Sequence, residues 1–175
     1  MKTKRSQAWI ETVVYTLIML TIIGIVLGVV KPSIQKKQDR TLIDQSINIL
    51  NSINYKNDDI LYYGPGNVGS VEIIIKKGIL SINGKSETIE FTMDSEAMYS
   101  QPDQEVKSGD ITILTQKKAS AYTVKLKLDY SAKENIMFNG KEDNKDLNPS
   151  PTQYTLFIKY ANNTESIPQI DFSLL

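Results

Sequence analysis

The chain has neither cysteine nor histidine, and only one tryptophan, among its 175 residues. These absences exclude disulfides, thiol catalysis, His-based triads and the usual zinc sites. There is also no surplus of positive charge, because 20 Lys and Arg residues face 20 Asp and Glu residues. A nucleic-acid-binding protein would need a basic face to neutralise phosphates. We therefore expect no enzyme, no cofactor, no metal site and no nucleic-acid partner.

Charge is also missing from one long stretch near the N-terminus. Lys2, Lys4 and Arg5 open the chain, and residues 12–30 then contain no charged residue. As a helix, residues 12–30 would span roughly 28 Å, close to the ~30 Å hydrocarbon core of a bilayer. This length predicts a single membrane-spanning segment. The 175 residues suit that segment plus one ordinary domain.

Two simple interpretations of the stretch explain it only in part. A removable secretory signal requires a small-x-small cleavage site, and the sequence from Gly28 to Pro32 has none. A plain anchor explains the length, but positive charges flank both ends, with Lys31 beginning the second group, so charge alone does not orient it. It also leaves Glu11 unexplained, because a carboxylate within such a run costs free energy unless it is paired or near the headgroups.

The residues from Lys4 to Glu11, followed by a long apolar helix, resemble the type III signal sequence of type IV pilin-like proteins. Gln7 at the start of the helix is most similar to the archaeal pilins. The resemblance covers roughly residues 2–55 and implies that residues 1–6 are a leader. A prepilin peptidase would cut between Ser6 and Gln7, with Ser6 standing where Gly or Ala is more usual. Glu11 would then be the fifth residue of the mature chain.

The resemblance implies a structural subunit of a type IV pilus-like surface filament. Its precursor would be a single-pass membrane protein with the head outside, and the assembled subunit would be extracellular. The implied partners are the membrane, the prepilin peptidase, the pilus assembly machinery, and identical or related pilin subunits. Cleavage creates an α-amino group on Gln7, which can meet Glu11 of another subunit and set the register of assembly.

Two further features of the segment bear on assembly. Gly24 and Gly28 have the G-x-x-x-G spacing that lets two helices approach closely, although glycine is also common in membrane helices without such a role. Pro32 lacks the amide hydrogen that a helix interior needs, so we expect a kink or break near it. Beyond Pro32, apolar residues at helical spacing predict an amphipathic helix to about Asn54, packed on the head.

The rest of the chain predicts an antiparallel β-sheet or small β-sandwich, and hence an α+β protein. We expect a helix over 7–55, a linker over 56–69 and a head over 70–175, because turn residues separate the helical and alternating patterns. Eight strands are predicted, at 71–75, 79–82, 88–93, 111–114, 122–130, 135–138, 154–160 and 167–174. Asn83-Gly84, Asn139-Gly140 and Asn162-Asn163 are predicted turns.

The head offers few candidates for chemistry. The acidic residues of 141–146 lack the glycine and terminal glutamate of a calcium loop, so we interpret them as a solvated loop. Asn162 begins an N-x-[ST] triplet on a predicted hairpin tip and is a candidate glycosylation site, with occupancy left open. Tyr62, Tyr63 and Tyr99 lie in predicted loops, where the alternatives to packing in the core are contact with a neighbouring subunit or with a ligand.

Two alternatives to the filament subunit remain at this stage. One is an uncleaved anchor that displays a β-sandwich binding module at the cell surface. The other, weaker one is a membrane-tethered hydrolase, which would need acidic residues gathered in a pocket. Within the filament interpretation, the sequence leaves open a major pilin, a minor or pseudopilin-like subunit and a flagellin-like subunit.

Overall fold

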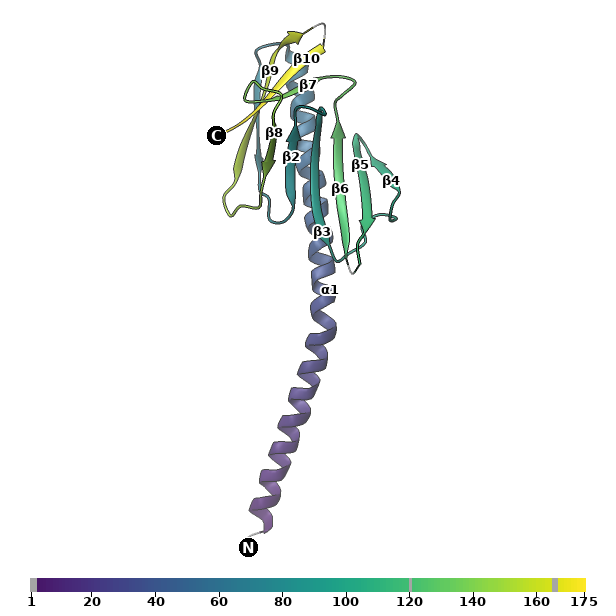
Figure 1. The fold of residues 1–175 in the computed structure, drawn as a ribbon. Coiled ribbons are helices and arrows are strands. Elements are labelled where there is room, and N and C mark those ends of the chain that lie inside the picture. Colours follow the sequence, from purple (N-terminus) through teal and green to yellow (C-terminus); the bar gives the residue numbers. More distant parts are fainter. Residues whose placement is uncertain (1–2, 120, 165–166) are drawn as a thin grey trace.

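One long helix organises the molecule. The computed structural model describes residues 3–119, 121–164 and 167–175, with side chains described for 9–119, 121–161 and 167–175. Helix α1 runs from Thr3 to Tyr63, which at 61 residues is about 90 Å. Its N-terminal half projects from the molecule as a stalk, and its C-terminal half packs on a β head (Figure 1). This confirms the predicted α+β fold, with a long N-terminal helix followed by a sheet-built head.

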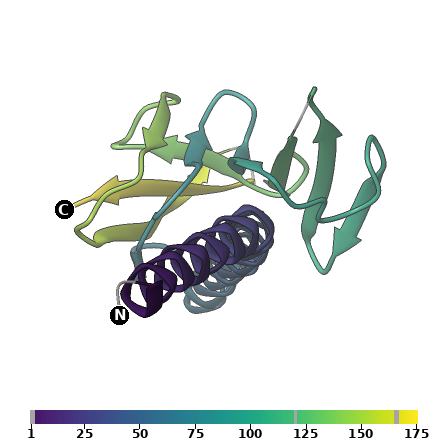
Figure 2. The same ribbon diagram turned by 90° about the horizontal axis from the view of Figure 1, so that it is seen from below.

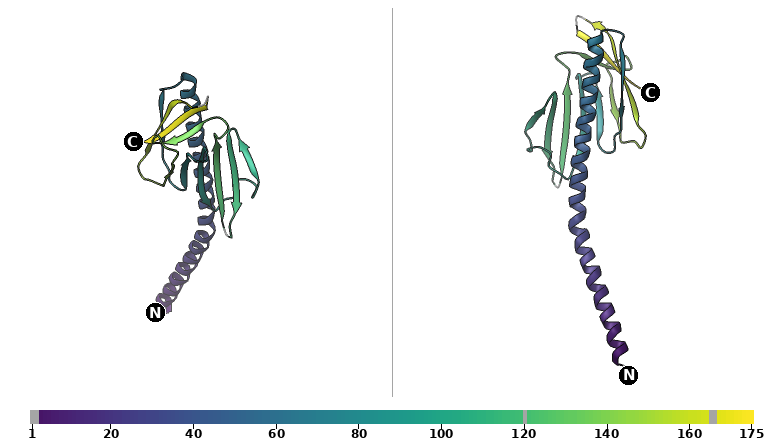
Figure 3. Two further views of the ribbon diagram at one scale, coloured as in Figure 1. Left: turned by 45° about the horizontal axis from the view of Figure 1, so that its top comes forward. Right: turned by 180° about the vertical axis from the view of Figure 1, so that it is seen from behind.

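The helix passes Pro32 without interruption. The predicted break is therefore absent, and the ribbon bends gradually along the stalk (Figure 3). Because proline has no amide hydrogen, the carbonyl of Gly28 loses its helical partner there. The cost is local, and the helix continues on both sides.

The predicted end of the helix near Asn54, with a linker over 56–69, is corrected by the structure. The helix continues to Tyr63, and β1 already begins at Val68, so the connection is only four residues long. The helix ends at Gly64, whose φ of 91° favours glycine and whose amide donates to the Leu61 carbonyl at 3.2 Å. The residues from Asn57 onward, which were predicted to form a turn, lie inside the helix because the head packs against this part of α1.

Ten strands form the part of the head that the structure describes. They are β1 (Val68–Ile73), β2 (Ile79–Asn83), β3 (Thr88–Ser95), β4 (Glu105–Ser108), β5 (Ile111–Lys117), β6 (Tyr122–Asp129), β7 (Asn135–Phe138), β8 (Asn144–Leu147), β9 (Tyr154–Thr164) and β10 (Ile167–Leu174). A four-stranded sheet has the order β1-β9-β10-β7, and a six-stranded sheet has the order β4-β5-β6-β3-β2-β8. Every pairing is antiparallel except β10 with β7.

All eight predicted strand regions are present, and β4 and β8 are additional. The Asn139-Gly140 turn is confirmed, since both residues have positive φ and Phe138 bonds across it to Lys141. The predicted turn at Asn162-Asn163 is wrong. Both residues belong to β9 and pair with Gln169 and Pro168 of β10. The hairpin of β9 and β10 is thus longer than the turn residues indicated.

The helix and both sheets share one core. Residues of α1 at alternating intervals of four and three are buried: Asp39, Ile43, Ser46, Leu50, Ile53, Asn57 and Ile60. This spacing places them on one face of the helix. That face contacts β1 and β9 of the first sheet and β3, β5 and β6 of the second. Both sheets lie on the same side of the helix when viewed along it (Figure 2).

Candidate assembly site on the N-terminal helix

The stalk is an apolar surface that the molecule itself does not cover. The most apolar window of α1 has a mean hydropathy of 2.7, and none of it is buried. Its large apolar side chains are exposed along its length. Trp9 near the start is 71% exposed, and Val29 near the end is 65% exposed. A helix that is apolar all round requires lipid or protein on every side. By length and composition, α1 is able to cross a membrane.

Three hydroxyl groups of the stalk donate to carbonyl groups of the same helix. Thr16 donates to the carbonyl of Thr12 at 2.6 Å, Thr21 to that of Leu17 at 2.8 Å, and Ser33 to that of Val29 at 3.3 Å. In a bilayer no water would satisfy these groups, so the internal bonds matter there. The polar side chains of the stalk are thus compatible with an apolar surrounding.

Glu11 is the sole charged residue between positions 9 and 30. Its side chain is exposed on the stalk. Gln7 and Glu11 both belong to α1 and are four residues apart in the chain. The side chains of Ser6 and Gln7 lie outside the described ones. The predicted cleavage position and the predicted register residue are neighbours in sequence near the start of one helix, and their roles stay predictions.

Gly24 and Gly28 have no packing role within the chain. A Cβ built on either glycine would meet nothing within 4 Å, and neither residue has a positive φ. Glycine in a helix interior costs roughly 1 kcal/mol relative to alanine. The folded chain offers no compensation for that cost, so the close approach of a second helix stays a prediction for this pair.

The other sequence candidates are now placed. Tyr62 and Tyr63 are exposed in the last turn of α1, with ring centroids 5.4 Å apart. Tyr99 instead packs on the core and donates to Asp44 at 2.8 Å. Burial and this hydrogen bond raise the pKa of Tyr99 to about 12. The 141–146 segment was interpreted as a loop, but its second half forms β8. The side chain of Asn162 lies outside the described ones.

Sequence reasoning missed a buried polar group where α1 meets the β6–β7 connection. Asn57 is fully buried, and its Nδ2 donates to Oε2 of Glu134 at 2.6 Å. Burial raises the pKa of Glu134, and the bond from Asn57 opposes that rise. Among the described residues, Oδ1 of Asn57 has no donor. The feature of the sequence that could have revealed this group is the heptad spacing, which places Asn57 on the buried face of α1.

A polar cavity of about 560 Å³ lies beside this group. Its lining includes Asp58, Asp110 and Lys133, and Tyr130 donates to Asn54 at 3.0 Å within it. Burial, followed by the charge of Asp110, raises the pKa of Asp58. No cluster of three or more metal-ligating side chains occurs among the described residues. We interpret the cavity wall as part of the contact between helix and head.

The stalk therefore stands as the principal candidate site. It is an uncovered apolar helix with one carboxylate, that of Glu11, near its start and two glycines, Gly24 and Gly28, near its middle. No protein-family model, curated protein or solved structure matches the chain.

Proposed function

We propose that the chain is a structural subunit of a type IV pilus-like surface filament. The precursor inserts in the membrane through α1, with the head outside. A prepilin peptidase removes residues 1–6, and the pilus assembly machinery polymerises the mature chain through its N-terminal helix. The observation that carries the proposal is the Lys4-to-Glu11 pattern at the start of a helix whose apolar first half is uncovered in the monomer.

Burial of the stalk supplies the driving force for this proposal. Apolar surface removed from water contributes about 25 cal/mol per Å², and every large apolar side chain from Trp9 to Val30 is exposed in the monomer. Lipid covers these side chains in the precursor. In a filament, the stalks of identical or related subunits would cover one another, so the same surface serves both states.

In this proposal Glu11 sets the axial register between neighbouring stalks. In a bundle of stalks its carboxylate would be buried, and an unpaired buried charge is costly. The new α-amino group of Gln7 on a neighbouring subunit is the partner of opposite charge. Only axial offsets that bring amine and carboxylate together avoid the cost, so the pair selects one register from many similar apolar packings.

Cleavage is the first step of the proposal, and it has a direct test. The chain is co-expressed with a prepilin peptidase, and its intact mass is measured. We expect loss of residues 1–6 from the unaltered chain and from Ser6→Gly. We expect an uncut chain for Ser6→Val, because the peptidase requires a small residue before the cut.

Ser33→Val is the matched control, since it makes the same change on the same helix away from the leader. It should be cleaved like the unaltered chain. Retention of residues 1–6 by every variant would contradict the proposal. That result would favour an uncleaved membrane anchor that displays the head as a binding module.

A further inference from the structure

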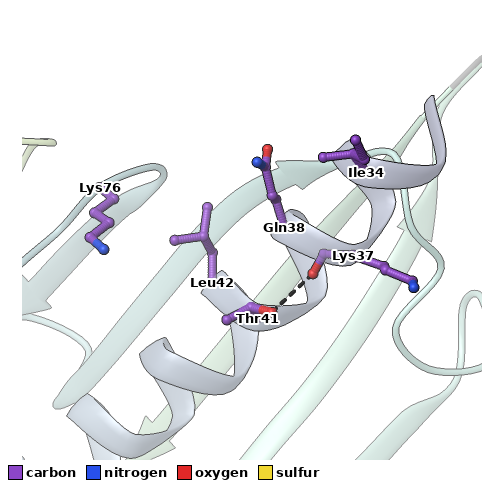
Figure 4. Close-up of a pocket in the computed structure, with 6 residues that line it drawn as sticks. All are labelled: Ile34, Lys37, Gln38, Thr41, Leu42 and Lys76. Carbon is purple, nitrogen blue, oxygen red and sulfur yellow. Dashed lines mark hydrogen bonds between the residues drawn. The ribbon is translucent and has the colours of Figure 1, made fainter. Parts of the chain in front are cut away.

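Positive charge gathers where the stalk meets the head. Five exposed basic residues lie there, and we call them the basic collar: Lys31, Lys36, Lys37, Arg40 and Lys76. The first four are on α1, and Lys76 is on the loop between β1 and β2. Lys76 lies across from Leu42 of the helix, whereas the side chain of Lys37 extends away from Lys76 (Figure 4). The collar thus combines two parts of the chain that are distant in sequence.

Two grooves border the collar, and Lys37 lines both of them. One, of about 480 Å³, is lined by Lys37 and Lys76 together with Ile34 and Leu42. The other, of about 440 Å³, is lined by Lys36, Lys37 and Arg40 together with Met98 and Glu96. Both present cationic groups beside apolar ones. A phospholipid surface has the complementary pattern of phosphates beside acyl chains.

Most acidic groups near the collar are already engaged. Asp39 binds Lys77 at 2.6 Å and accepts the amide of Glu96 at 2.8 Å. Asp94 binds Lys118 at 3.0 Å. Asp44, one turn above Arg40, accepts the hydroxyl of Tyr99.

The collar therefore keeps its charge. Among the described residues, none of its five members forms an ion pair. Only the carboxylate of Glu96 lines either groove, so positive charge remains in excess.

The height of the collar matches the lipid headgroups. If residues 12–30 cross the hydrocarbon core, Lys31 follows directly, and Arg40 lies roughly 15 Å beyond Val30. The headgroup layer is about 5–8 Å thick on each side. Charge interactions extend about 8 Å further at physiological ionic strength. The four basic groups on α1 are then within reach of the headgroup phosphates.

We infer that the basic collar docks the head onto an anionic phospholipid surface on the outer side of the membrane. The inference rests on α1 as a membrane anchor, as in the proposed function, but requires neither cleavage nor a filament. It also accounts for basic residues at both ends of the apolar segment. The leading group precedes the segment, and the collar binds the opposite leaflet. Docking holds the head against the bilayer and limits its tilt.

The absence of cysteine permits a direct test on the full chain. Met98, which is 49% exposed and lines the second groove, is replaced by Cys and labelled with a fluorophore. The labelled chain is placed in nanodiscs at one copy per disc, with phosphatidylcholine alone or with added phosphatidylglycerol. A small fraction of lipid carries a nitroxide on its headgroup, which quenches the fluorophore only at short range.

Charge variants identify the groups responsible. The collar variant carries Lys36→Gln, Lys37→Gln, Arg40→Gln and Lys76→Gln. The matched control removes the same charge from exposed lysines elsewhere on the head, with Lys85→Gln, Lys133→Gln, Lys141→Gln and Lys145→Gln. Circular dichroism establishes that both variants keep the fold. A label at Tyr62→Cys, at the far end of α1, reports any quenching unrelated to docking.

We expect quenching at position 98 to be at least twofold stronger in anionic discs than in neutral ones. The increase should disappear near 1 M salt, where the Debye length is about 3 Å. It should also disappear in the collar variant and persist in the control. Equal quenching in both lipids, or equal loss in both variants, would overturn the inference. So would an increase that needs two copies per disc, which would assign the collar to a second chain.

Discussion

At the scale of single residues, Glu11 has the greatest consequence for the proposed assembly. It is exposed on the stalk and, in sequence, is the one charged residue between positions 9 and 30. Near the end of the apolar segment the membrane tolerates it at small cost. In a bundle of helices the same carboxylate would require a partner, which the amine of Gln7 provides after cleavage.

The first prediction is that Glu11→Val impairs filament assembly and leaves membrane insertion intact. Valine removes the charge that selects the register but keeps the apolar surface that enters the membrane. Filament yield and membrane-bound protein are measured in the same cells. Thr16→Val, which introduces the same side chain further along the stalk, should leave both unchanged. Normal filament yield from Glu11→Val would refute the register argument.

A second residue-scale feature is the pair of Asn57 and Glu134. Burial raises the pKa of Glu134 above its usual 4.5, so its ionised form is less stable in the folded head than in the unfolded chain. The folded state then binds more protons than the unfolded state above pH 4.5, and this group lowers stability as the pH rises through that region. The donor bond from Asn57 limits the loss.

The second prediction follows for Asn57→Ala. It removes the donor, raises the pKa of Glu134 further, and should lower the free energy of unfolding by about 2 kcal/mol at pH 7. The deficit should shrink below pH 4.5, where the carboxyl is protonated in both states. Denaturant unfolding of the full chain in detergent, followed by circular dichroism, measures it. The exposed Asn48→Ala is the control, and a deficit independent of pH would contradict the charge-based account.

At the scale of elements, α1 is one helix whose two halves have different surfaces. Its first half is apolar on all sides and uncovered, whereas its second half buries one heptad-spaced face against both sheets. Leu50 and Ile53, at the centre of that face, are fully buried. The second half thereby fixes the direction in which the stalk leaves the head.

The third prediction concerns this contact. Leu50→Ala should lower the free energy of unfolding of the head by roughly 2–5 kcal/mol, because it leaves a cavity between helix and sheets. Leu27→Ala makes the same change at a side chain that is 63% exposed. It should leave head unfolding unchanged in the same detergent. Equal effects of the two substitutions would show that the stalk contributes to head stability as much as the packed face does.

The elements differ in how far the sequence predicts them. Strands that face the core, such as β6, alternate apolar and polar residues and were predicted. The strands β4 and β8 lie at the two edges of the six-stranded sheet. All four residues of β4 are exposed, and so are the first three of β8. Their pairing is carried by backbone hydrogen bonds, which leave no apolar pattern.

The end of α1 and the buried pair of Asn57 and Glu134 could not be predicted from the sequence, and for the same reason. Asn57 is typical of turns, and only its bond to Glu134, 77 residues away, explains its place inside a helix. Long-range contacts of this kind are not encoded by local spacing. The stalk, in contrast, could be predicted from local sequence. Its apolar run and basic flanks are local, so the sequence predicted the exposed helix that the structure contains.

At the scale of the whole molecule, function is divided along the long axis. The uncovered stalk lies at one end, the basic collar lies where it meets the head, and the two sheets pack on one side of the far half of α1 (Figure 1). Under the proposed function, this separation would let the stalk exchange lipid for neighbouring stalks without unfolding the head. The head would then form the outer surface of a filament.

The N-terminus of the chain in surface filaments tests this account most directly. Filaments are sheared from intact cells that make the protein, separated from membranes, and analysed by intact-mass spectrometry and N-terminal sequencing. The account predicts the chain in the filament fraction, beginning at Gln7 with its α-amino group free. A chain that keeps residues 1–6 and occurs only in the membrane fraction would contradict it.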